Sequence, residues 1–176
     1  MDSSSWPYIA ILILIALSAF FSGSEIAFAS ANKMRLKKNA AENGGRDKTA
    51  FEISEDYDSA LSAILIGNNL VNIAASSVAT VIALSIFGEN SSKGPAIATV
   101  VMTVLILIFG EIVPKIVAKK NCDRFAVAVA VPDKLVMMVF KPVNAVVLWV
   151  IARFEKLWGT KEDAPSVTEE ELASII

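Results

Sequence analysis

The chain has 176 residues, 55% of them hydrophobic, and a formal net charge of −2. Its mean hydropathy is +0.58, and the apolar residues lie in long runs, which is typical of a membrane protein and not of a soluble domain. The net charge gives no indication of nucleic acid as a partner. There is one cysteine and no histidine, which excludes an intrachain disulfide and histidine-based metal or catalytic sites. A metal site made of oxygens alone would favour Mg²⁺, Ca²⁺, Mn²⁺ or an alkali ion.

Three segments are long and apolar enough to cross a membrane. The first runs from Trp6 to Ser30, the second from about Ala60 to Phe87, and the third from just after Lys93-Gly94-Pro95 to about Lys115. Each has roughly 20 residues or more, which is enough for a hydrocarbon core of about 30 Å. Backbone groups in lipid must be hydrogen-bonded internally, so the sequence predicts three transmembrane helices.

The basic residues predict the orientation of these helices. A polar loop, Ala31–Tyr57, with its turn at Asn43-Gly44-Gly45, separates the first two spans and contains six Lys and Arg residues. The next loop, Gly88–Gly94, contains only Lys93. Four more basic residues follow the third span: Lys115, Lys119, Lys120 and Arg124. Basic residues favour the cytoplasmic side, so we expect a cell-membrane protein with an extracytoplasmic N-terminus and a cytoplasmic C-terminus.

The segment after the third span is apolar but interrupted by prolines. Pro132-Asp133-Lys134 and Lys141-Pro142 divide Phe125–Ile151 into short pieces, and proline ends or kinks helices. We therefore expect short helices at the cytoplasmic interface. The alternative is a fourth, kinked span, which would place the C-terminus outside.

The remaining segment, Arg153–Ile176, is polar and acidic. Thr168 and Glu171 are spaced as a helix N-cap and its capping-box partner. The sequence stops within this expected helix, so we expect a soluble domain to follow in the native protein. The resulting division is a transmembrane core at 1–120, a juxtamembrane belt at 121–152 and an acidic cytosolic linker at 153–176.

Each span carries a polar interruption beside a glycine. The interruptions are Ser22-Gly23-Ser24-Glu25, then Gly67-Asn68-Asn69 followed by Asn72, and then Gly110-Glu111 followed by Pro114. Glycine and proline allow a membrane helix to open its hydrogen-bond ladder and to expose carbonyl oxygens to an ion. At 1.5 Å per residue, Ser22, Asn68 and Glu111 all lie roughly 6–9 Å to the cytoplasmic side of the midplane. This common depth predicts one shared cation site.

Helical spacing supports the same site. Ser18, Ser22 and Glu25 share one face of the first span, and Asn68 and Asn72 share one face of the second. Structural alternatives remain open for each residue: close helix packing at Ser22, interhelical hydrogen bonds from the asparagines, an i,i+4 ion pair from Glu111 to Lys115, and an interfacial position for Glu25. An ionised carboxylate in the membrane core costs roughly 2–3 kcal/mol or more, and a bound cation would offset that cost.

The three motifs Phe21–Glu25, Ile66–Asn72 and Phe109–Lys115 resemble the transmembrane domain of the CorC/CNNM family, which is associated with magnesium transport. The resemblance covers nearly the whole chain. It implies an all-α membrane protein: a homodimer with three transmembrane helices per subunit, short juxtamembrane interfacial helices and a cytosolic acidic helical segment. That segment would lead to a cytosolic CBS-pair domain, absent here, that binds ATP with Mg²⁺.

The resemblance also implies a set of Mg²⁺ ligands. These are the side chains of Ser22 and Asn68, the carbonyl region of Gly110 and the carboxylate of Glu111. The supporting positions are Asn72, Pro114, Ser24, Glu25 and Asn69.

The expected function is Mg²⁺ transport, in the direction of export, and family likeness implies Na⁺ as the coupling ion. The alternative is a membrane sensor that binds Mg²⁺ and regulates another transporter. An enzyme is not expected, because there is no histidine, no aspartate within the spans, and no zinc-protease or G-x-S-x-G signature. The expected partners are the lipid bilayer, a second copy of the chain and the CBS pair.

Overall fold

A computed structural model describes residues 5–88 and 93–158. The described residues divide into two units between Asn144 and Ala145. The first unit holds all the features of the candidate site. In the second unit, the described residues 145–158 are the C-terminal part of helix α7.

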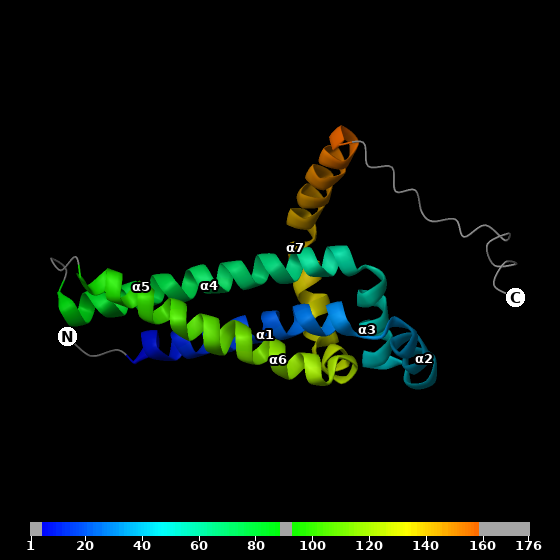
Figure 1. The fold of residues 1–176 in the computed structure, drawn as a ribbon, viewed down its shortest axis with the longest axis horizontal. Helices are drawn as coiled ribbons and strands as arrows, with labels where there is room; N and C mark the ends of the chain where they lie inside the picture. The colour runs from blue at the N-terminus through cyan, green and yellow to red at the C-terminus, as the bar shows by residue number, and fades with distance from the viewer. Residues whose placement is uncertain (1–4, 89–92, 159–176) are drawn as a thin grey trace, which may run out of the picture. The chain divides into compact units, whose positions relative to one another are not determined.

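Three long apolar helical segments form the bundle, as the sequence predicts (Figure 1). The first is α1 (Trp6–Ser30) and the second is α4 (Tyr57–Phe87). The third is continuous through α5 (Lys93–Leu105), a π-helix η1 (Ile106–Ile112) and α6 (Val113–Lys120). Segments Trp6–Ser30, Tyr57–Phe87 and Gly94–Lys120 have the length and composition needed to cross a membrane. This confirms the predicted all-α fold with three spans.

The surface of the spans fits a lipid environment. Large apolar side chains point outward on each of them: Leu12 is 68% exposed, Ile73 is 65% exposed and Val100 is 65% exposed. In water such an apolar surface would favour aggregation, whereas in a bilayer it faces hydrocarbon. Within the bundle, α1 packs against α4, η1 and α6, and α4 packs against α5.

The segment between the first two spans is helical, so the prediction of a polar loop at Ala31–Tyr57 is wrong. It forms a hairpin of α2 (Lys33–Asn43) and α3 (Gly45–Glu55). The predicted turn is confirmed, because Gly44 adopts a φ of +65°, which favours glycine. Polar composition concealed the helices, since each buries only a narrow apolar face, formed by Leu36 in α2 and by Ala50 and Ile53 in α3.

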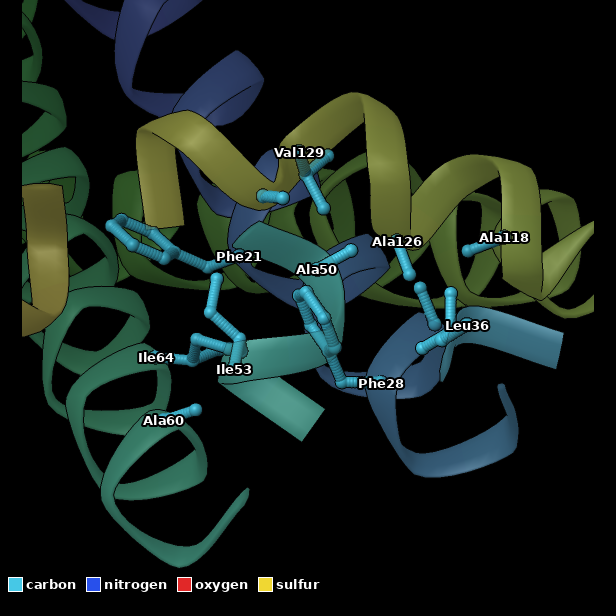
Figure 2. Close-up of a cluster of buried hydrophobic side chains, with 12 residues drawn as sticks. Phe21, Phe28, Leu36, Ala50, Ile53, Ala60, Ile64, Ala118, Ala126 and Val129 are labelled. Carbon is cyan, nitrogen blue, oxygen red and sulfur yellow. The ribbon is translucent and has the colours of Figure 1, made fainter. Parts of the chain in front are cut away.

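A hydrophobic cluster joins this hairpin to the bundle (Figure 2). Phe21 and Phe28 of α1 lie in it beside Leu36 of α2 and Ile53 of α3. Its other buried members are Ala27, Ala50, Ala60, Ile64, Ala118, Ala126, Val129 and Ala130. The cluster therefore holds α2, α3 and the start of α7 (Cys122–Trp158) against the spans.

Helix α7 corrects the prediction of separate short helices in 125–151. It includes Pro132 and Pro142 within its length. A proline removes one helical hydrogen bond and usually kinks a helix, but packing can hold the two sides in place. Ala126, Val129 and Ala130 are buried at helical spacing just before Pro132, so the apolar face supports the helix across it. By length and composition, α7 is not among the candidate membrane spans of the described residues.

The start of α2 is tied to the start of α7 by polar contacts. Asp123 Oδ1 accepts a hydrogen bond from the Asn32 backbone N–H at 2.8 Å. The Arg35 guanidinium lies 3.5 Å from the other carboxylate oxygen of Asp123. Asn32 in turn caps α2, because its side chain accepts a hydrogen bond from the backbone N–H of Arg35. The predicted cap at Thr168 and Glu171 lies outside the described residues.

Candidate cation site

Polar atoms from all three spans meet in the bundle interior. The hydroxyl of Ser18 on α1 donates to Oδ1 of Asn68 on α4 at 3.2 Å. The same hydroxyl lies 3.5 Å from the carbonyl oxygen of Gly110 in η1. Ser18 is fully buried and Asn68 is 9% exposed. We call Ser18, Asn68 and Gly110 the three-span cluster.

Pro114 removes the α-helical hydrogen-bond donor to the carbonyl of Gly110. In an α-helix the residue four positions later would donate its N–H to this carbonyl, but Pro114 has no N–H. The π-helix η1 covers the same stretch, Ile106–Ile112. Such π-turns are rare in proteins, and those that occur are often found at functional sites. The predicted interruption of the third span is therefore present, as a change of helix type.

The other two spans are not interrupted, which corrects the expectation of opened ladders at their glycines. Both α1 and α4 are continuous α-helices through Gly23 and Gly67. The glycines serve close packing instead: a Cβ at Gly67 would lie 2.6 Å from the ring of Phe21, and one at Gly110 would lie 2.6 Å from Ser18 Oγ. Small residues thus bring the spans close enough for their polar groups to touch.

Two further buried polar atoms belong to residues one helical turn after Ser18 and Asn68 in the sequence. Ser22 follows Ser18 by one helical turn and is 0% exposed, and its hydroxyl has no hydrogen-bond partner in the described part of the chain. Asn72 follows Asn68 by one turn, and its Oδ1 is likewise buried without a partner there. Buried polar atoms are almost always satisfied in folded proteins. Two orphaned oxygens on the faces that carry Ser18 and Asn68 are therefore a feature expected of a ligand site.

The carboxylates of the motifs separate into different environments. Glu25 forms an ion pair with Lys115 at 3.1 Å, so the predicted alternative pairing of Lys115 with Glu111 does not occur. Within residues 5–88 and 93–158, Glu111 has no ion-pair partner. Glu111 is half-buried in η1 directly after Gly110. Of the two acids, it is the one left to balance a cation's charge.

Asn69 and Ser24 point elsewhere. Asn69 is exposed, and its amide donates to the carbonyl of Leu65 at 3.0 Å, so it lies outside the three-span cluster. Ser24 is fully buried, but on the side of α1 that carries Phe21 and Phe28, which pack toward α7. There it lies beside Asp133 of α7.

Asp133 is a buried acid that the sequence did not single out as a site residue. It is 0% exposed, and neither of its carboxylate oxygens has a hydrogen-bond partner within the described residues. Burial raises the pKa of Asp133 from 3.8 to about 7, against an opposing, lowering effect of the nearby Ser24 hydroxyl. No well-formed hydrogen bond joins the two, because Ser24 Oγ is also without a partner. We call Ser24 and Asp133 the α1–α7 pair.

No group of three or more His, Cys, Asp or Glu side chains converges in the parts of the chain that the structure covers. The three-span cluster offers hydroxyl, amide and carbonyl oxygens instead, with one carboxylate next to it. Such neutral oxygen ligands suit a hard cation and do not suit zinc or copper.

These features define a multi-pass membrane protein with a polar, oxygen-lined contact between three spans. The chain belongs to a family of transporter-type membrane domains: residues 9–176 match the model of the "Cyclin M transmembrane N-terminal domain", CNNM. This confirms the resemblance seen in the three motifs.

Relatives in bacteria and plants share the domain. The chain is 37% identical to a "UPF0053 protein" of Haemophilus influenzae, over all of this chain and 42% of that protein. It is 31% identical to the "UPF0053 inner membrane protein YfjD" of Escherichia coli, over 91% of this chain and 37% of that protein. A chloroplastic DUF21 domain-containing protein of Arabidopsis thaliana is 37% identical over 91% of this chain and 24% of its own length. The chain thus spans less than half the length of these relatives.

Proposed function

We propose that this chain is the membrane domain of a Mg²⁺ transporter and that the ion binds between the three spans. The observation that carries the proposal is the meeting of Ser18, Asn68 and the Gly110 carbonyl from three separate helices. A hydrogen bond between two spans needs only a donor and an acceptor. The Gly110 carbonyl adds an oxygen from a third span, and the buried oxygens of Ser22 and Asn72 lie one helical turn away in sequence. A hard cation is bound by several such oxygens.

The chemistry of the donors fits Mg²⁺ as the transported ion. Mg²⁺ takes about six oxygens at roughly 2.0–2.1 Å and gives up its water reluctantly. In this proposal the ligands are Ser22, Asn68, the Gly110 carbonyl and Glu111, joined by Ser18. One formal negative charge against a divalent ion favours weak binding, and weak binding allows release.

The proposed direction is export from the cytoplasm. The basic residues of α2 and α3 favour the cytoplasmic side, so the N-terminus would lie outside. Na⁺ as coupling ion, a homodimer and a following CBS pair that binds ATP with Mg²⁺ are parts of the same proposal and derive from the family resemblance. The shared site would be reached from the end of the bundle at which α2 and α3 lie.

Flux of Mg²⁺ into proteoliposomes tests the proposal, with and without an opposing Na⁺ gradient. We expect flux in the parent chain and at least a tenfold loss in Asn68→Ala and in Glu111→Ala. Asn69→Ala is the matched control, because the neighbouring asparagine is exposed and should keep its flux. Equal flux in the parent chain and in both site variants would exclude this site.

The same experiment separates a transporter from a sensor. Calorimetric Mg²⁺ binding that depends on Asn68, without flux in either this chain or the full-length protein, would indicate a regulator of another transporter. Flux that appears only in the full-length protein would instead show that the cytosolic part is required.

A further inference from the structure

Among the residues that the structure describes, no basic side chain pairs with the carboxyl of Asp133. The adjacent Lys134 points away and pairs with Glu52 of α3 at 2.6 Å. On the α1 side, the nearest charged residue in sequence is Glu25, which pairs with Lys115. Lys134 and Lys115, the two lysines considered as partners for Asp133, therefore each pair with another acid. A buried carboxylate without a partner is destabilising.

The hydroxyl of Ser24 faces the same contact and is equally unsatisfied. Its residue is 0% exposed and its oxygen has no hydrogen-bond partner among the described residues. The neighbouring turns of both helices are apolar, with Phe21 and Ala27 on α1 and Val129 and Ala130 on α7, all buried. Three oxygens therefore lie together in an otherwise apolar helix contact. A buried carboxylate beside an unpartnered hydroxyl provides the kind of oxygen atoms that bind a hard cation.

We propose that Asp133 and Ser24 form a binding site for a monovalent alkali cation at the contact of α1 and α7. One carboxylate neutralises one positive charge, so a monovalent ion leaves the buried site neutral. A divalent ion would leave a net charge of +1 in apolar surroundings, at a large desolvation cost. The oxygen ligands suit hard ions such as Na⁺ and K⁺.

This site is separate from the three-span cluster and does not rest on the proposed function. Ser24 is six residues from Ser18, which is about 9 Å along the helix axis. It also lies on a different face of α1, since a rotation of about 100° per residue carries it well away from Ser18. An ion at this site would join α7 to the first span and would not lie among the three spans.

Thermal unfolding of the purified chain in detergent at pH 8 tests the site. The probes are NaCl, KCl and choline chloride at equal concentration, with choline too large to enter. A ligand that binds only the folded state raises the unfolding midpoint. We expect a midpoint at least about 3 °C higher in one alkali chloride than in choline chloride. The salt that gives the larger shift identifies the preferred ion.

Variants assign the effect to these residues. Asp133→Asn keeps the shape and removes the charge, so the three salts should give the same midpoint. Ser24→Ala removes one ligand and should raise the alkali concentration for half-maximal shift by about tenfold. Glu52→Gln is the matched control: it removes the same charge from an exposed acid next to Lys134 and should keep the full alkali response.

Three outcomes would overturn the proposal. The first is a parent chain with the same midpoint in all three salts. The second is an alkali response that survives in both Asp133→Asn and Ser24→Ala. The third is a midpoint at pH 6 to 8 that falls equally in every salt, which would show that a proton alone occupies the carboxyl. Because Asn68→Ala and Glu111→Ala should keep the alkali response, failure of Mg²⁺ transport and failure of this site are distinguishable.

Discussion

The three-span cluster and the α1–α7 pair are both buried and polar, but they satisfy their polar atoms differently. In the first, Ser18 donates to Asn68, and neither residue is ionisable. In the second, Asp133 is ionisable and neither it nor Ser24 has a partner in the described structure. A neutral hydrogen-bonded contact is stable when empty, whereas a buried carboxyl requires a proton or a cation. The three-span cluster therefore suits an ion that binds and dissociates, and the α1–α7 pair suits an ion that remains bound.

The largest expected difference between the three-span cluster and the α1–α7 pair is in how the stability of the fold depends on pH. Burial raises the folded-state pKa of Asp133 from 3.8 to about 7, so the folded chain holds this proton more tightly than the unfolded chain. Its contribution is complete below pH about 4 and is lost as the pH rises through about 7. The difference of roughly 3 pKa units sets an upper limit of about 4 kcal/mol. The three-span cluster has no such dependence.

Unfolding midpoints between pH 4 and 8 in choline chloride measure this effect. The parent chain should lose stability as the pH rises, and Asp133→Asn should be flatter over the same range. A parent chain that gains stability across this range would contradict the assignment to Asp133.

Added methyl groups should affect the two regions separately. In Gly110→Ala the new Cβ would meet Ser18 Oγ at 2.6 Å, and in Gly23→Ala it would meet the ring of Phe125 on α7 at 2.7 Å. Overpacking of this kind costs about 1–3 kcal/mol. Gly110→Ala should abolish Mg²⁺ flux and keep the alkali response, while Gly23→Ala should weaken the alkali response. Identical effects of the two variants on both readouts would mean that the regions are not independent.

A double-mutant cycle sharpens the contrast at the three-span cluster. Ser18→Ala and Asn68→Ala each remove one side of the 3.2 Å hydrogen bond. Each should cost about 1 kcal/mol, and the pair should cost less than the sum, with a coupling of about 0.5–1.5 kcal/mol. Denaturation of the four proteins in one detergent gives the coupling. Additive losses would show that Ser18 and Asn68 do not interact.

The smallest effect is expected at the surface beside Asp133. Lys134 and Glu52 form an ion pair at 2.6 Å with about half of each side chain exposed, and the lysine lowers the pKa of Glu52 by its hydrogen bond and charge. Exposed pairs contribute little. Glu52→Gln should change the unfolding midpoint by less than about 2 °C. A larger loss would mean that this pair, and not the buried acid, fixes α7.

The spans were predictable from the sequence because lipid imposes a simple rule on length and polarity. The segments Trp6–Ser30 and Tyr57–Phe87 match the predicted first and second spans within a few residues. The hairpin of α2 and α3 was not predictable by the same rule, because its apolar faces are narrow and lie within a charged segment. In this hairpin, only the turn at Gly44 could be predicted from the local sequence.

The observed polar contact between the spans lies one helical turn from a predicted site residue. Depth counting led to Ser22, whereas the observed partner of Asn68 is Ser18, one turn earlier on the same face. Depth estimates from hydropathy cannot resolve a single turn of about 5.4 Å. The burial of Asp133 was hidden because Pro132 suggested a break at that point, while burial depends on which helix lies opposite. That information is in the tertiary structure alone.

The π-helix η1 has a consequence for the genetics of this domain. A π-turn corresponds to one extra residue inserted into an α-helix. Deleting one residue between Ile106 and Gly110 would therefore restore regular α-geometry in η1, and the turns on either side would keep their orientation. A one-residue deletion before Asn68 in the regular α-helix α4 would instead rotate Asn68 by about 100° and carry it away from Ser18. The third span can thus lose a residue in η1 and keep its facing surface, whereas the second span cannot lose one before Asn68.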